Sequence, residues 1–144
     1  MIEVKNVSKS FDDKTILHNV SAQFRDGITN LIIGQSGSGK TVLMKSLVGL
    51  HTPDEGEILY AGRDLLKMNN NQRKALRKEI GMLFQGSALF DSETVLGNVM
   101  FPLKMFSDMS YEEQLERAHF CINRVNLVGA DDKYPSEISG GMQK

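Results

Sequence analysis

The sequence of 144 residues has one cysteine, three prolines and no long apolar run. The single Cys121 cannot form an internal disulfide bond, which fits a protein of a reducing compartment. Spanning a bilayer takes about 18 or more consecutive apolar residues, and no run approaches that length. The first residues, MIEVKNVSK, lack the apolar core of a secretion signal. These absences predict a soluble cytoplasmic domain.

The chain also lacks an excess of charge of either sign. Its net charge of −1 gives no global basic field, so we expect no nucleic-acid partner. The basic cluster Arg73, Lys74, Arg77 and Lys78 is interpreted as a solvated helix face. The three histidines are scattered without metal-ligand spacing. Neither a nucleic-acid site nor a histidine metal centre is predicted.

Hydrophobic periodicity predicts strands and a helix in the first part of the chain. Residues 1–27 alternate as β-strands do, with turns at 12–13 and 26–27. The run 29–34 is continuously apolar, which is typical of a strand buried on both faces. Leucines at 43, 47 and 50 then recur at helical spacing, which predicts a helix. Gly49 and Pro53 are its expected end signals. Further strands are predicted at 57–60 and 80–84.

The rest of the pattern is helical. A polar helix is predicted over 69–78, with Asn70 or Asn71 as its N-cap. A short helix over 94–101 should stop at Pro102. Ser110 and Glu113 form a capping box for another helix. Its inner face is predicted to hold Leu115, Ala118, Ile122 and Val125.

The stretch GQSGSGKT has the spacing G-x-x-x-x-G-K-[ST] of a phosphate-binding loop, with a predicted strand before it and a helix after it. Glycines without β-carbons let the backbone N–H groups approach phosphate oxygens, and the helix start adds its positive dipole end. The alternative is a flexible turn with a solvated lysine. We predict a nucleotide site at Gly34, Gln35, Ser36, Gly37, Ser38, Gly39, Lys40 and Thr41.

Two later stretches narrow the class of nucleotide-binding protein. Gln85, in FQG, follows a predicted strand at the sheet edge where α/β proteins bind ligands. Ser139, in ISGGMQK, is a good N-cap and precedes Gly140 and Gly141. This second stretch is therefore predicted to be a helix N-terminus able to hold phosphate.

The order of phosphate loop, FQ and SGG resembles the ATP-binding subunit of ABC transporters over the whole chain. The resemblance makes 34–41 the Walker A motif, Gln85 the Q-loop glutamine and ISGGMQ the counterpart of the LSGGQ signature, with Met142 displacing its glutamine by one position. It implies an α/β fold, a RecA-like P-loop core with an antiparallel β edge and a helical subdomain. The expected parts are the β edge (1–28), the core (29–85), the helical subdomain (86–136) and the signature (137–144).

The resemblance also implies ligands and partners. ATP would bind with Mg²⁺, which Thr41 and Gln85 would hold, and Phe11 would stack on adenine; the alternative for Phe11 is an ordinary hydrophobic anchor. Two subunits would pair as a homodimer, with each ATP between one 34–41 loop and the partner's Ser139, Gly140 and Gly141. An integral membrane permease would bind the subunit at the inner face of the cell membrane.

Within that family, the segment 81–103 is most similar to the ATPase subunits of Mla-type phospholipid transporters, which implies lipid transport. Two alternatives remain. A small-molecule kinase would need an acceptor site and would leave SGG unexplained. A non-transport ABC ATPase would lack a membrane partner.

The residues that hydrolyse ATP in this family follow the signature. They are the Walker B aspartate, the adjacent glutamate and the switch histidine, and the sequence ends at Lys144 before any of them. No catalytic residue is therefore predicted among these residues. The expectation is a fragment that binds ATP weakly at best, hydrolyses none, and either self-associates or rests its C-terminal residues on a neighbour.

Overall fold

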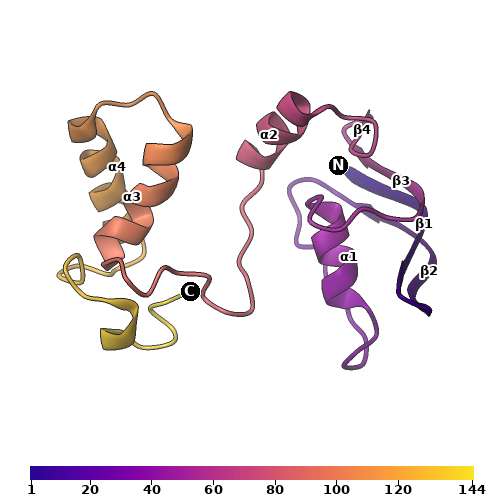
Figure 1. Cartoon of the computed structure of the whole chain (residues 1–144), viewed down its shortest axis with the longest axis horizontal. Coiled ribbons are helices and arrows are strands. Elements are labelled where there is room, and N and C mark those ends of the chain that lie inside the picture. Colours follow the sequence, from indigo (N-terminus) through magenta and orange to yellow (C-terminus); the bar gives the residue numbers. More distant parts are fainter. The chain divides into compact units, whose positions relative to one another are not determined.

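The computed structural model describes residues 1–144, which form two compact units, Met1–Gly81 and Met82–Lys144 (Figure 1). Each unit has its own hydrophobic core. None of the helices combines the length and the apolar character that crossing a bilayer requires.

An antiparallel sheet forms the first unit's framework, in the order β2-β1-β3-β4. Its strands are β1 (Ile2–Phe11), β2 (Lys14–Phe24), β3 (Glu55–Tyr60) and β4 (Arg63–Asp64). Phe11 pairs with Lys14 at the β1–β2 turn, and Val4 pairs with both Ala22 and Ile58. The predicted β structure of residues 1–27 is confirmed. The strand predicted at 57–60 is also present but begins two residues earlier.

Helices α1 (Lys40–Leu47) and α2 (Asn70–Lys78) complete the first core. Leu43 and Leu47 of α1 and Leu76 of α2 are buried with apolar side chains of the sheet. The hydroxyl of Tyr60 donates a buried 2.6 Å hydrogen bond to the Leu47 carbonyl oxygen, and burial raises the pKa of this phenol. The sheet thereby contacts α1 through both apolar packing and a polar bond.

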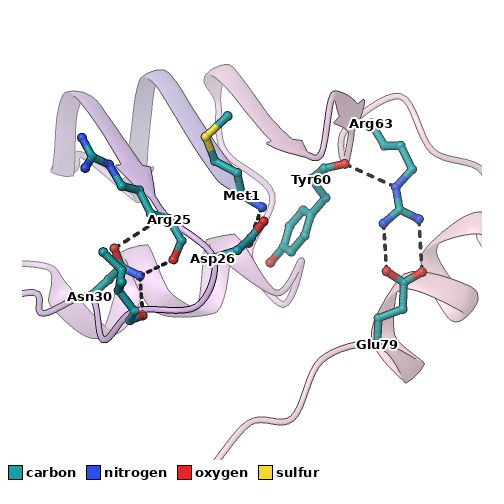
Figure 2. A network of polar contacts seen from close by, with 8 residues as sticks. Met1, Arg25, Asp26, Asn30, Tyr60, Arg63 and Glu79 are labelled. Carbon is teal, nitrogen blue, oxygen red and sulfur yellow. Dashed lines mark hydrogen bonds and ion pairs between the residues drawn. The ribbon is translucent and has the colours of Figure 1, made fainter.

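Side-chain bonds fix the ends of several elements in this unit (Figure 2). Arg63 of β4 donates two hydrogen bonds to Glu79, which follows α2, at 3.1 and 2.8 Å. Asn30 accepts from the Arg25 amide at 3.1 Å and donates to the Arg25 carbonyl at 2.9 Å, closing the turn after β2. That turn leads the chain toward residues 29–34.

The N-cap predicted for α2 is off by one residue. Asn69 is the N-cap, and its side chain accepts a 3.0 Å hydrogen bond from the Gln72 amide. The Asn69 amide in turn donates to the side-chain oxygen of Gln72 at 2.9 Å. Three consecutive asparagines compete for the cap, and only Asn69 has a glutamine three residues later to complete a capping box.

The strands predicted at 29–34 and 80–84 are absent from the structure. Leu31 and Ile33 are each 81% exposed, and Leu83 is 66% exposed. A strand buried on both faces requires hydrogen-bonded neighbours and covering layers. The apolar residues make these segments suitable for a buried strand, but no strand in the structure pairs with either segment. Neither segment therefore forms a strand.

The second unit contains α3 (Val95–Phe106), α4 (Tyr111–Arg124) and the short 3-10 helix η1 (Pro135–Glu137). Ser110 and Glu113 form the predicted capping box of α4. Ala118 and Ile122 are buried as predicted, whereas Val125 is 63% exposed because the helix ends one residue before it. Leu115 is half-buried, so the predicted inner face holds fully for Ala118 and Ile122 and is wrong for Val125, which lies beyond the helix.

Pro102 does not stop α3, contrary to the prediction. The helix runs from the Thr94 N-cap to Phe106 with Pro102 inside it. Proline removes one backbone hydrogen bond but leaves the bonds on either side possible. Beyond Pro102, the last turn is closed by the amide and the hydroxyl of Ser107, which donate to the Leu103 carbonyl oxygen at 3.0 and 2.7 Å.

Candidate nucleotide-binding site

Steric constraints shape the loop between residue 34 and α1. Gly39 is buried and has φ +91°, and a β-carbon there would lie 3.1 Å from the Ile16 carbonyl oxygen and from the Leu17 side chain. Gly37 has φ +79° but open space around it. Positive φ at two positions suits glycine and rarely other residues. The loop thus turns twice while Gly39 lies against β2.

The side chain of Lys40 folds back and bonds to the first residues of the loop. Its ammonium donates hydrogen bonds to the carbonyl oxygens of Gly34 at 2.8 Å and Gln35 at 2.7 Å. An ammonium has three donors, so one remains for a ligand. The side chain is half-buried, which limits its motion. The cation is therefore already inside the loop before any anion binds.

Backbone N–H groups of the loop are free to bind an anion. Within the loop, the Ser38 amide donates to the Gln35 carbonyl oxygen at 3.2 Å, and the Leu43 amide donates to Gly39 at 2.9 Å. The amides of Gly37, Gly39, Lys40 and Thr41 make no hydrogen bond in the structure. The start of a helix leaves such donors unsatisfied and adds a partial positive charge. Phosphate oxygens match both the donors and the charge.

Thr41 offers a hydroxyl beside this anion site. The residue is exposed, and its side chain makes no hydrogen bond in the structure. Mg²⁺ prefers oxygen ligands and is commonly held by one protein oxygen together with nucleotide phosphates and water. The donor chemistry at Thr41 therefore fits the expected metal ion.

Phe11 lies at the end of β1, and its side chain is 40% exposed. It pairs with Lys14 at the start of β2. Two residues farther along β2, Ile16 contacts the position of Gly39. Because a strand advances about 3.3 Å per residue and paired strands lie about 5 Å apart, Phe11 is on the order of 10–15 Å from the loop. A base and a triphosphate are separated by a comparable distance.

The second unit holds the remaining predicted site residues. Gln85 is exposed and precedes α3 in a segment without regular structure. The hydroxyl of Ser139 accepts a 3.3 Å hydrogen bond from the Met142 amide, and the Gln143 amide donates to the Ser139 carbonyl oxygen at 3.1 Å. Ser139 therefore has the bonding of an N-cap, but a single turn follows it instead of the predicted helix. Gly140 and Gly141 are exposed on that turn.

Sequence reasoning missed two residues near the candidate site. The ring of His51 meets the ring of Phe11 edge to face, with centroids 5.2 Å apart and planes at 75°. The ammonium of Lys9 lies 5.3 Å from the centroid of the Phe11 ring. The position of Lys9 two residues before Phe11 on one strand was a usable signal. No local pattern connects His51 with Phe11.

Comparison with known proteins identifies the family of the chain. The family model described as "ABC transporter" matches residues 17–144. The methionine import ATP-binding protein MetN of Clostridium tetani is 37% identical over all of this chain and 45% of its own length. The phospholipid transport ATP-binding protein MlaF of Haemophilus influenzae is also 37% identical, over all of this chain and 54% of its own length. The chain thus spans about half the length of these relatives.

A solved structure is similar over nearly the whole chain. The dimeric ATP-binding cassette MJ0796, bound to ADP and Pi in a post-hydrolysis state, matches with a TM-score of 0.87 and 30% identity. The match covers 99% of this chain and 65% of that one. The mixed α/β fold of the ATP-binding cassette, with its antiparallel sheet, is the fold of this chain.

Proposed function

Since this chain belongs to the ABC transporter family, we propose that it is part of an ATPase subunit that drives transport across a membrane. The observation that carries the proposal is the loop at 34–41, where free amides and the Lys40 ammonium converge. Residues 1–28 and 29–85 would supply the β edge and core of this subunit. Residues 86–136 and 137–144 would supply the helical subdomain and the signature.

Each loop residue has a proposed task. The free amides would bind phosphate oxygens of ATP, and the third donor of Lys40 would reach the β- and γ-phosphates. Thr41 would hold Mg²⁺, which when bound neutralises phosphate charge. The exposed ring of Phe11 would stack on adenine through its π face. Hydrolysis would need a further group that orients the attacking water.

Pairing of two subunits is the proposed working assembly. The similar cassette MJ0796 is described as a dimer. In the proposed homodimer, Ser139, Gly140 and Gly141 of one subunit would meet the ATP held by the other. The exposed turn of these residues, with its N-cap bonding, supports that role because its N–H groups are accessible. The assembly would bind a permease at the inner face of the membrane.

A phospholipid or another lipid is the proposed cargo. The segment 81–103 is similar to Mla-type ATPases, and MlaF is 37% identical over all of this chain. Methionine import is the second candidate because MetN has the same identity to this chain. Deletion of the gene in its host separates the two. Lipid transport predicts an altered envelope lipid distribution with normal uptake of labelled methionine.

Nucleotide binding is the first test. Titration of the 144-residue chain with Mg-ATP should give saturable binding, and Lys40→Ala should weaken it at least about tenfold, because loss of a charge-assisted bond commonly costs more than 1.4 kcal/mol. Lys74→Ala removes an exposed charge from α2 and serves as the matched control. Equal affinity in the parent and Lys40→Ala would contradict the proposal.

A further inference from the structure

The ring of Phe11 is held by contacts from two directions. His51 contacts it edge to face at 5.2 Å and 75°. The Lys9 ammonium lies over it at 5.3 Å. These contacts leave 40% of the residue exposed. An aromatic side chain at a strand end normally turns freely about its side-chain bonds, so two such contacts restrict the orientation of its face.

His51 itself is fixed at both sides. Its amide donates to the Lys45 carbonyl oxygen at 3.3 Å, which ties it to the end of α1. Three residues later, the Asp54 amide donates to the Ser8 carbonyl oxygen at 2.9 Å, and the Asp54 carboxylate accepts from the Ser10 amide at 2.6 Å. The segment that carries His51 is thus bonded to α1 and to the end of β1.

Lys9 belongs to the same set of bonds. Its ammonium donates to Asp54 at 2.6 Å, and its side chain is only 16% exposed. Asp54 therefore holds Lys9 near the Phe11 ring and also anchors the segment of His51. One carboxylate connects both neighbours of the ring.

We propose that His51 is a positioning residue for the nucleotide base: it fixes the orientation of Phe11 so that the exposed part of the ring accepts adenine. The proposal rests on the proposed function, because it needs a base at Phe11. It adds a specificity element to the loop at 34–41, which binds phosphates whatever the base. His51 touches Phe11 and not the phosphate loop, so its effect should depend on the base.

An opposite role is sterically conceivable, in which His51 covers the ring and a base must displace it. The two roles predict opposite effects of His51 on the affinity for ATP. A positioning residue strengthens binding of ATP, and a covering residue weakens it. The bonds of residues 51–54 to α1 and β1 favour positioning, because they hold the backbone of His51 beside Phe11 and leave its ring only rotation between side-chain rotamers.

The experiment compares two ligands that share phosphates but differ in the base, Mg-ATP and inorganic magnesium triphosphate. Affinities are measured by amide shifts in ¹⁵N-labelled protein. His51→Ala should weaken ATP binding about two- to tenfold, the range expected for one aromatic contact. It should leave triphosphate binding unchanged. His51→Phe, which keeps an aromatic edge, should restore the affinity for ATP, and His18→Ala on β2 should alter neither ligand.

A spectroscopic readout separates positioning from general structure. The chain has three tyrosines but no tryptophan, so Phe11→Trp introduces a single tryptophan at the ring position, which can be excited selectively. Adding His51→Ala should lower its fluorescence anisotropy, because the ring gains freedom, while the melting temperature stays close to that of Phe11→Trp alone. Unchanged anisotropy would contradict positioning even if the affinity for ATP falls.

Failure of this inference is distinguishable from failure of the proposed function. If the parent chain binds ATP and triphosphate but His51→Ala binds ATP as well as or better than the parent, only the role of His51 is overturned. Equal losses for both ligands would also overturn it. If the parent binds neither ligand, the proposed function fails and the role of His51 falls with it.

Discussion

Among single residues of the loop, Gly39 combines a positive φ with a close backbone neighbour. It has φ +91°, and a β-carbon would lie 3.1 Å from the backbone oxygen of Ile16. Strands cannot shift their backbone as easily as a side chain can rotate. A larger residue at 39 would therefore have to displace β2 or change the shape of the phosphate loop.

Gly39→Ala should lower the free energy of unfolding by about 1–3 kcal/mol, since an alanine at positive φ is strained and must also displace β2. Urea denaturation measures the change. Gly81→Ala is the control, because nothing lies within 4 Å of its added β-carbon and its φ is not positive. Its effect should stay within about 0.5 kcal/mol. Equal effects in both variants would contradict the constraint.

Asp54 makes a second residue-scale prediction, on pH. The hydrogen bond from Lys9 and that from the Ser10 amide hold the pKa of its carboxyl below the ordinary value. A carboxylate with a lowered folded pKa stabilises the fold above its unfolded pKa of about 3.9, and this contribution disappears as pH falls through the folded pKa.

Asp54→Asn should therefore reduce stability at pH 7, and its difference from the parent should shrink as pH falls below about 4. Chemical denaturation at a series of pH values measures this difference. Asp13→Asn, in the exposed β1–β2 turn, is the matched control. A constant difference between Asp54→Asn and the parent across the series would exclude the Lys9 bond as the source.

Among the elements, α3 carries an exposed proline at an interior position. Pro102 cannot donate the hydrogen bond that residue 98 would accept, and its ring is exposed to solvent. Pro102→Ala should raise stability by about 1–2 kcal/mol, less than the full 3 kcal/mol interior penalty because the unfolded chain also gains freedom.

Pro135→Ala provides the contrast for that prediction. Pro135 is buried at the first position of η1, where a missing donor costs nothing and the fixed φ suits the turn. Its replacement should lower stability. Thermal unfolding measures both variants, and a loss of stability in Pro102→Ala would show that the proline ring contributes to packing.

Prediction from sequence succeeded where the determinant of an element is local. The box of Ser110 and Glu113 spans one helical turn, so the sequence alone indicated where α4 begins. The motif at 34–41 is equally local, and its binding of phosphate stays a prediction. The strands predicted at 29–34 and 80–84 were wrong, because a strand forms only when another strand elsewhere in the chain pairs with it. The contact of His51 with Phe11 joins residues forty positions apart, which no periodicity encodes.

For the whole molecule, the exposed apolar residues of 29–34 have a consequence for association. Leu31 and Ile33 are each 81% exposed in a segment with no paired strand. Such surface favours contact between copies of the chain. We expect concentration-dependent self-association of the 144-residue chain.

Replacing Leu31 and Ile33 together by serine should lower the average mass measured by light scattering. Val128→Ser, which removes a 77% exposed side chain from the second unit, should have a smaller effect. A parent chain that remains a monomer at all concentrations would contradict this expectation.

The central claim is that the backbone of residues 34–41 binds the phosphates of a nucleotide. The most direct test is an amide-resolved NMR titration of the chain with Mg-ATP. The account predicts saturable shifts that are largest at Gly37, Gly39, Lys40 and Thr41, whose amides are free in the structure. Saturating Mg-ATP that leaves these four amides unshifted would contradict it.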